Sequence, residues 1–175
     1  MDRTLEAFAR LADEYPDATL TIVGIGEMEG QLRARIGQLG LQERVALTGG
    51  LPHEEVLRRM AQSDLFVLPS WGEGYGIVYI EAMAAGCIAV GAKDEGIADT
   101  ITDGENGFLV PAGGIDETER VMRQVFAHPE RYEALRQKGM QAARGLTWAR
   151  NAEQTAEVYR EAIEHWRKEH AQARH

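Results

Sequence analysis

Two glutamates in a glycine-rich stretch are the residues best suited to carry chemistry in this chain. Glu73 and Glu81 lie within residues 69–86, with seven residues between them and an apolar stretch before them. The pattern predicts a glycine-hinged loop that holds Glu73, followed by a helix whose first turns carry Glu81. A carboxylate can accept hydrogen bonds from two adjacent hydroxyls, and the unpaired N–H groups at the start of a helix bind phosphate. The stretch is therefore suited to bind a sugar and a phosphate side by side.

Short apolar strands alternate with helices along much of the chain. Strands are expected at residues 20–23, 45–47, 64–68, 87–90 and 107–110, and helices at 4–12, 27–39, 52–60 and 77–85. After Pro111 the pattern changes to helices alone, at about 116–127, 130–144 and 148–168. Such alternation indicates parallel βαβ units, so we predict an α/β, Rossmann-like doubly wound parallel sheet with a helical C-terminal tail. We expect one domain over residues 1–175, with βα units in 1–111 and C-terminal helices in 112–175.

The composition of the chain indicates which partners and which cellular compartment to expect. The 175 residues carry a net charge of −9, and an acidic surface repels the phosphates of nucleic acid. No apolar run reaches the length of about 18 residues that a membrane-spanning helix needs, and no signal-peptide pattern opens the sequence. The single cysteine, Cys87, lies in an apolar run, which fits a buried thiol in a reducing compartment. We therefore expect a cytoplasmic protein with no nucleic-acid partner, and leave peripheral contact with a membrane open.

Residues 68–107 resemble the C-terminal, nucleotide-sugar-binding half of retaining glycosyltransferases with the GT-B fold. The likeness is to the group 1, or family 4, type, which includes sucrose synthases, bacterial mannosyltransferases and many enzymes of cell-surface polysaccharide biosynthesis. Its hallmark is a strand ending in Pro-Ser, then a glutamate, seven residues and a second glutamate, which here are Glu73 and Glu81. Three other parts of the sequence also look like the family's pattern: residues 20–26, residues 96–110, and Thr147-Trp148 with Tyr159.

The resemblance implies a role for each matching residue. Glu73 would be the catalytic residue and would accept hydrogen bonds from hydroxyls of the donor sugar, while Glu81 would bind the ribose hydroxyls. The N–H groups of Tyr75 and Gly76 would reach the sugar, and those of Ile77 and Val78 would face the diphosphate. The candidate donor-binding residues are therefore Glu73, Gly74, Tyr75, Gly76, Ile77, Val78 and Glu81, together with Gly24 and Gly26. Transfer of a hexose-type sugar from a nucleoside-diphosphate sugar to an acceptor, with retention, is the function this implies.

Gly24 and Gly26 leave two interpretations open. They follow a predicted strand, and they form either a structural turn or part of the lining of the nucleotide pocket. A dinucleotide fingerprint is a poor match because the third glycine, Gly30, comes one position late. His53 is also open between a plain helix start and, as the resemblance implies for its loop, a contact with the nucleotide base.

The spacing of residues along the sequence also bears on a possible metal site and on the core. No Asp-x-Asp occurs, and His165 and His170 are five residues apart, which does not place two ligands on one helical face. We expect no metal site and no cofactor. Trp148 and Tyr159 are eleven residues apart, and core packing on a shared apolar face is expected for them.

The sequence departs from the family at its beginning. In the family a strand with an arginine, then a lysine and a glycine, opens this half, and both cations grip the diphosphate; Arg3 lies beyond that motif. The absent strand would be the central one of the sheet, so the strands at 20–23 and 64–68 would flank a gap or pair with each other. The acceptor-binding half is absent too, so we expect this chain to be inactive alone and to need that domain or a second chain. The alternatives are a non-catalytic partner subunit or fragment that only binds the nucleotide-sugar, and a nucleotide-sugar epimerase.

Overall fold

The computed structural model describes residues 2–72, 74 and 76–172. Its contacts divide the chain into two units, Met1–Ala143 and Arg144–His175, and each is described separately. The prediction of one domain over the whole chain therefore stays a prediction. Glu73 and Tyr75, the two residues expected beside the donor sugar, lie outside the described residues.

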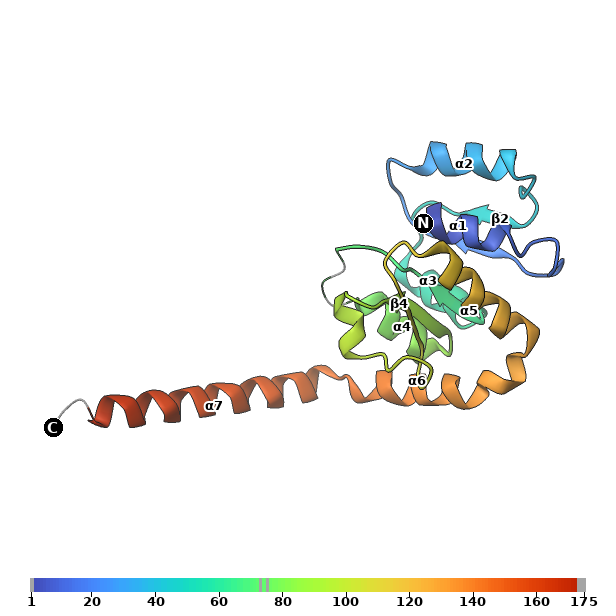
Figure 1. The fold of residues 1–175 in the computed structure, drawn as a ribbon. Helices are drawn as coiled ribbons and strands as arrows, with labels where there is room; N and C mark the ends of the chain where they lie inside the picture. Colours follow the sequence, from blue (N-terminus) through green and yellow to red (C-terminus); the bar gives the residue numbers. More distant parts are fainter. Residues whose placement is uncertain (1, 73, 75, 173–175) are drawn as a thin grey trace. The chain divides into compact units, whose positions relative to one another are not determined.

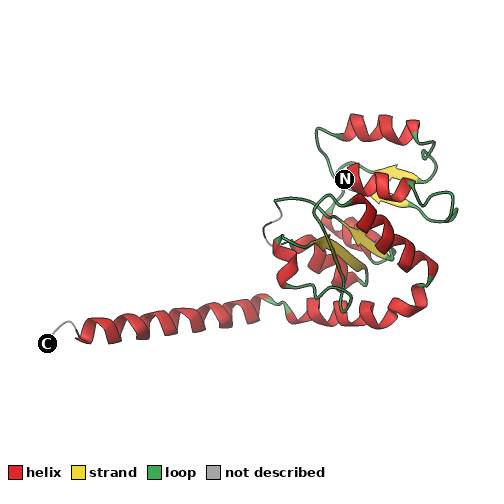
Figure 2. Cartoon of the chain, in the orientation of Figure 1, coloured by secondary structure: helices red, strands yellow, loops and turns green. Residues whose placement is uncertain are grey.

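The first unit is built from short strands connected by helices (Figures 1 and 2). Its strands are β1 (Leu20–Ile22), β2 (Val45–Leu47), β3 (Leu65–Val67), β4 (Ile88–Ala92) and β5 (Phe108–Val110). Its α-helices are α1 (Asp2–Ala9), α2 (Glu29–Gln38), α3 (His53–Met60), α4 (Ile77–Ala85), α5 (Ile115–Ala127) and α6 (Glu133–Gly145), the last of which runs two residues past the boundary. Two 3-10 helices, η1 (Gly96–Asp99) and η2 (Pro129–Tyr132), complete it. The predicted α/β class, with helices alone after β5, is confirmed.

All the paired strands are parallel, in two sheets. One sheet has the order β1-β2 and the other the order β3-β4-β5. Leu20 faces Val45 in the first, while Leu65 faces Ile88 in the second. Within the described residues β1 does not pair with β3, so of the two arrangements expected for these strands the structure has the gap.

The core lies between the sheets and their helices and joins the two sheets. Its largest cluster is centred on α1, α2, β1 and β2, and Leu65 and Val67 of β3 pack against it. Met122 of α5 belongs to the same cluster, and α5 makes extensive contact with α1. The two sheets are therefore held together by side chains, because no strand hydrogen bonds connect them in the described part of the chain.

Most of the predicted elements have the expected bounds within a few residues. The strand at 45–47 and the helix at 77–85 match β2 and α4 residue for residue. Gly40 has the left-handed conformation expected after α2, with φ of 69°. The two 3-10 helices were not expected, and β4 continues two residues beyond the predicted end.

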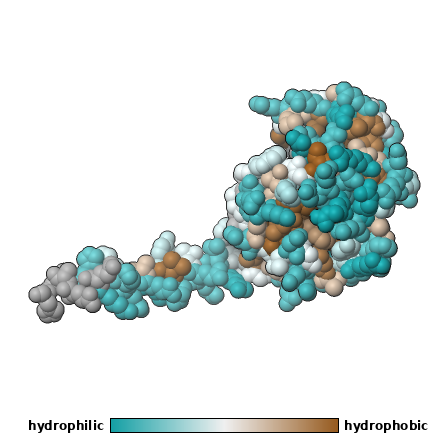
Figure 3. Space-filling view, viewed as in Figure 1, coloured by the Kyte–Doolittle hydropathy of each residue, from teal (hydrophilic) through white to brown (hydrophobic). Residues whose placement is uncertain are grey.

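The second unit consists mainly of α7 (Trp148–Gln172). Trp148 is 85% exposed and Tyr159 is 65% exposed, so the prediction that they pack in a core is wrong. Val158, Ile163 and Trp166 are exposed as well, and Figure 3 shows hydrophobic colour on a mostly hydrophilic α7. The helix is regular because its sequence is rich in helix-forming residues. In the described part of the chain, no helix combines the length and apolar character needed to cross a bilayer.

Candidate functional site

The loops that follow the parallel strands gather the predicted binding residues at the carboxyl edges of the two sheets. The N–H of Gly24, just after β1, donates to the carbonyl of Gly49, just after β2, at 2.9 Å. The N–H of Gly113, after β5, donates to the carbonyl of Pro69, after β3, also at 2.9 Å. Ligands of open α/β sheets bind outside this edge, so these loops define the candidate site.

Gly24 and Gly26 lie in the exposed loop between β1 and α2. Gly24 has φ of 135°, a conformation that side chains with a Cβ rarely adopt. Ile25 between them is 84% exposed and lies against Gly50, where a Cβ would be 3.4 Å from its Cγ1. The structure thus brings the two glycine loops together, and both the turn and the pocket-lining interpretations of Gly24 and Gly26 stay open.

Helix α4 begins at a glycine that packing also requires. Gly76 precedes the helix with φ of 71°, in the left-handed region. A Cβ at Gly76 would lie only 2.7 Å from Cδ2 of Tyr79, whose ring is fully buried. The Tyr79 hydroxyl in turn donates to the carbonyl of Leu68 at the end of β3. The start of α4 is therefore fixed against the end of the strand that leads into the site.

The start of α4 has no side-chain cap among the described residues. Ile77 in its first turn is 57% exposed, while Val78 is half-buried. The first N–H groups of a helix have no intrahelical acceptor, and they carry the positive end of the helix dipole. Gly76, Ile77 and Val78 are thus placed where an anion would meet N–H donors.

Glu81 lies one turn further along α4, with a side chain 29% exposed. Its Oε1 is 3.5 Å from Nε2 of His53, the first residue of α3. The contact joins the start of the helix that follows β2 to the helix that follows β3. His53, whose role the sequence left open, therefore contacts Glu81 at the edge of the candidate site.

The loop between β3 and α4 is tied down from two further sides. The N–H of Gly72 donates to Oε1 of Glu95, just before η1, at 2.9 Å. The Trp71 indole, 66% exposed, lies so close to Gly113 that a Cβ there would overlap it. Gly74, in the same loop, is exposed. These contacts hold Trp71 and Gly72, which precede Glu73, while the placement of Glu73 itself lies outside the described residues.

Four residues at the site were not predicted from the sequence: Glu95, Trp71, Gly113 and Tyr79. Glu95 and Gly72 are 23 positions apart, so no local pattern connects them. The double glycine after β5 was the one available signal, because it marks a turn that can approach another chain segment closely.

No metal centre is evident in the part of the chain that the structure describes. There, no three His, Cys, Asp or Glu side chains lie close enough together to hold a metal ion. The expectation that the protein uses no metal and no cofactor stays a prediction. What the described residues offer is a carboxylate, N–H donors and glycine backbone.

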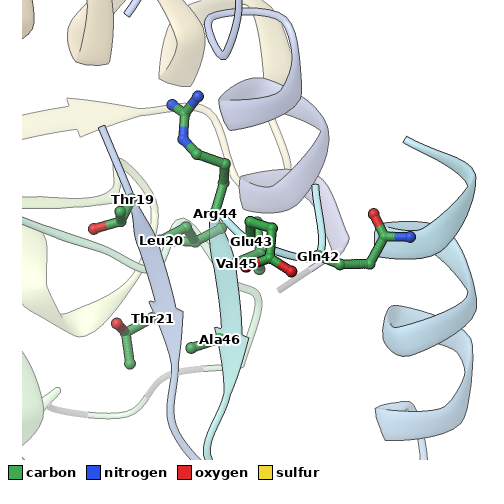
Figure 4. Close-up of a pocket in the computed structure, with 8 residues that line it drawn as sticks. All are labelled: Thr19, Leu20, Thr21, Gln42, Glu43, Arg44, Val45 and Ala46. Carbon is green, nitrogen blue, oxygen red and sulfur yellow. The ribbon is translucent and has the colours of Figure 1, made fainter. Parts of the chain in front are cut away.

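A separate cavity of about 280 Å³ lies over the amino ends of β1 and β2 (Figure 4). It is lined by Thr19–Thr21 and Gln42–Ala46. Arg44, the strongest candidate there for binding an anion, already donates to the carbonyls of Ala18 and Tyr15 at 2.7 Å. The cavity is at the opposite strand ends from the predicted binding residues, so it is not the candidate site.

Comparisons with known proteins identify the family and the fold of the chain. The family described as glycosyl transferases group 1 matches residues 1–142. The chain is an α/β domain that belongs to the group 1 glycosyltransferase family.

Two relatives show how much of such a protein the chain represents. It is 33% identical over 141 residues to the GDP-mannose-dependent alpha-(1-6)-phosphatidylinositol monomannoside mannosyltransferase of Mycolicibacterium smegmatis, covering 77% of this chain and 37% of that protein. It is 32% identical over 152 residues to D-inositol 3-phosphate glycosyltransferase 1 of Catenulispora acidiphila, covering 83% of this chain and 36% of the relative. The chain thus spans little more than a third of each relative's length.

Solved structures show the same fold. Anabaena HepE in complex with UDP-glucose superposes with a TM-score of 0.80 at 25% identity, over 92% of this chain and 45% of HepE. The C-terminal domain of the group 1 glycosyl transferase LpcC from Francisella tularensis superposes with a TM-score of 0.75 at 23% identity, over 82% of this chain and 76% of that domain. The chain therefore has the Rossmann-like fold of a GT-B half, as expected.

Proposed function

We propose that this chain is the donor-binding half of a retaining glycosyltransferase that takes a hexose-type sugar from a nucleoside diphosphate. The observation that carries the proposal is the start of α4. Its first N–H groups have no side-chain cap among the described residues, and the partly exposed carboxylate of Glu81 lies on the same helix of a group 1 family member. The N–H groups of Ile77 and Val78 would bind the diphosphate, and Glu81 would accept hydrogen bonds from the ribose hydroxyls.

The chemistry of transfer suits such a site. Negative charge grows on the diphosphate as the bond to the sugar breaks, so N–H donors aimed at it stabilise the transition state more than the ground state. Glu73 would orient the sugar by accepting from its hydroxyls, and Gly74 would let the backbone approach the ligand. The GDP-mannose named for one relative and the UDP-glucose bound to HepE support a nucleotide-sugar donor.

A second polypeptide segment would complete the enzyme. Among the described residues, β1 pairs only with β2 and β3 only with β4, and these strand edges together with the exposed apolar side chains of α7 support an incomplete unit. We propose that the chain alone does not turn over a donor, that the acceptor is bound by another domain or chain, and that the enzyme works in the cytoplasm, in cell-surface polysaccharide biosynthesis. The same observations favour, as a second candidate, a partner subunit that only binds the donor.

Calorimetric titration of the full chain with UDP and GDP tests donor binding. We expect one of the two to bind, and Glu81→Gln to weaken that binding, while Glu105→Gln, in an exposed turn before β5, leaves it unchanged. If neither nucleotide binds, or if Glu81→Gln has no effect, the proposed donor site is wrong. Incubation with UDP-glucose and GDP-mannose tests incompleteness: sugar transfer by the chain alone would contradict that part.

A further inference from the structure

Two side chains from different helices meet at the edge of the proposed ribose site. Nε2 of His53 is 3.5 Å from Oε1 of Glu81, and the His53 side chain is 67% exposed while that of Glu81 is 29% exposed. Glu81 is the one charged residue of α4, so no other ionised side chain of that helix can engage His53. On α3 itself, Glu55 forms ion pairs with Arg58 and Arg59.

A glutamate that binds two neighbouring hydroxyls must present its carboxylate in one orientation. The flexible side chain of a free glutamate samples several rotamers. Ordering it when the ligand binds costs conformational entropy, which lowers the affinity for the ligand. A contact at Oε1 fixes the plane of the carboxylate and leaves Oε2 and the remaining lone pairs free to accept. An imidazole that carries its proton on Nε2 can make that contact whether it is neutral or charged.

We propose that His53 is a positioning residue that pre-orients Glu81 for the two hydroxyls of the donor ribose. The inference rests on the proposed function, in which Glu81 binds the ribose, and it adds a residue that acts only through Glu81. His53 stabilises the bound-state orientation of the carboxylate before the nucleotide arrives.

The test measures how strongly the full chain distinguishes UDP and GDP from their 2′,3′-dideoxy analogues. Two charge-assisted hydrogen bonds predict that the wild type prefers the ribose form by about tenfold or more. His53→Ala should reduce that preference to roughly threefold, because Glu81 remains but is no longer oriented. His53→Gln, which keeps an N–H donor near the position of Nε2, should restore most of the preference.

A double-mutant cycle separates positioning from a general effect on the fold. In a Glu81→Gln background, His53→Ala should leave the remaining preference unchanged, because its effect passes through the carboxylate. His128→Ala is the matched control, since His128 is half-exposed and lies 3.6 Å from Glu130 in a similar pair outside the site. That variant should keep the full preference.

The outcomes distinguish this inference from the proposed function. A wild type that binds both forms equally, or binds neither, overturns the ribose role of Glu81 and the inference with it. A wild type that prefers the ribose form while His53→Ala does so equally overturns the inference alone. A loss that Gln does not restore, or that persists in the Glu81→Gln background, also contradicts positioning through Glu81.

Discussion

The two sheets of the first unit differ in how completely their strands are buried. Every residue of β4 is buried, and this strand sits between β3 and β5. In the two-stranded sheet, β1 and β2 each have an exposed central residue, Thr21 and Ala46. Apolar burial therefore stabilises the three-stranded sheet along the whole of its central strand, while each strand of the two-stranded sheet is buried only in part.

In the two-stranded half, hydrogen bonds and ion pairs add to the apolar packing. Arg44, at the start of β2, donates to the carbonyls of Ala12, Tyr15 and Ala18 at 2.7–3.3 Å. Arg10, just beyond α1, forms ion pairs with two acids of α5. The half that carries the start of α4 thus has a fully buried strand at its centre, whereas the half that carries the Gly24 loop combines the largest apolar cluster with ion pairs and hydrogen bonds of a few charged groups.

The largest effect is expected for Gly76→Ala, in the three-stranded half. The new Cβ would lie 2.7 Å from Cδ2 of Tyr79, and the residue would keep φ of 71°. The backbone strain and the overlap together should lower the free energy of unfolding by about 3 kcal/mol. Gly104→Ala is the matched control, because Gly104 has φ of 74° and no neighbour within 4 Å of a Cβ. Urea unfolding should show a loss of about 1 kcal/mol there, and equal losses would mean that packing at Tyr79 is not tight.

Arg44→Met should have the next largest effect, in the two-stranded half. Three backbone carbonyls would lose their donor, which should lower the free energy of unfolding by about 2 kcal/mol. Arg33→Met is the control, since Arg33 pairs only on the helix surface with Glu29 at 3.0 Å, and its loss should cost less than about 0.5 kcal/mol. If urea unfolding gives the same small change for both variants, the two-stranded sheet does not depend on Arg44.

Much of the fold could be predicted from the sequence, because turn residues bound its elements. The bounds of α4 follow from Gly76 and Gly86, which flank it and both have positive φ. The end of β4 was placed too early, because Gly91 gives no apolar signal, although it packs under Ile97 and Tyr79. The exposed stripe of α7 could not be distinguished from a core stripe, because helical periodicity shows which residues share a face and not what covers it.

The site was predictable only where its residues lie on one element. Gly76, Ile77, Val78 and Glu81 fall at the start of α4 as expected, because the glycine pattern and helical period locate that start. The contact between Gly72 and Glu95 joins residues far apart in sequence, and it depends on how β3 and β4 pair. Such contacts follow from tertiary structure, so a local sequence pattern does not contain them.

A third, smaller effect concerns the thiol at the start of β4. Burial raises the pKa of Cys87 from 9.0 to about 11, and the thiol donates to the carbonyl of Met60 at 3.0 Å. The unfolded thiol loses its proton at lower pH than the native one, so the native state loses stability as pH rises from 9 to 11. By pH 10 this loss should reach about 1.4 kcal/mol. Unfolding of the wild type and Cys87→Ala at pH 8 and pH 10 should show that difference; the same pH dependence in both would contradict tight burial of this edge.

The smallest effect is expected where α5 meets α1, at Glu119. Hydrogen bonds from Arg10 and then Arg123 lower the pKa of the Glu119 carboxyl. A carboxyl with a lowered native pKa adds stability above the pKa of its unfolded form, and that stability is lost as pH falls through the native value. Unfolding at pH 7 and pH 3 should therefore show a stability difference between wild type and Glu119→Gln that shrinks on acidification. Glu105→Gln, at an exposed turn, controls for the other carboxyls. If the difference for Glu119→Gln does not depend on pH, the ion pairs add no stability, and packing of α1 on α5 alone holds the two-stranded half.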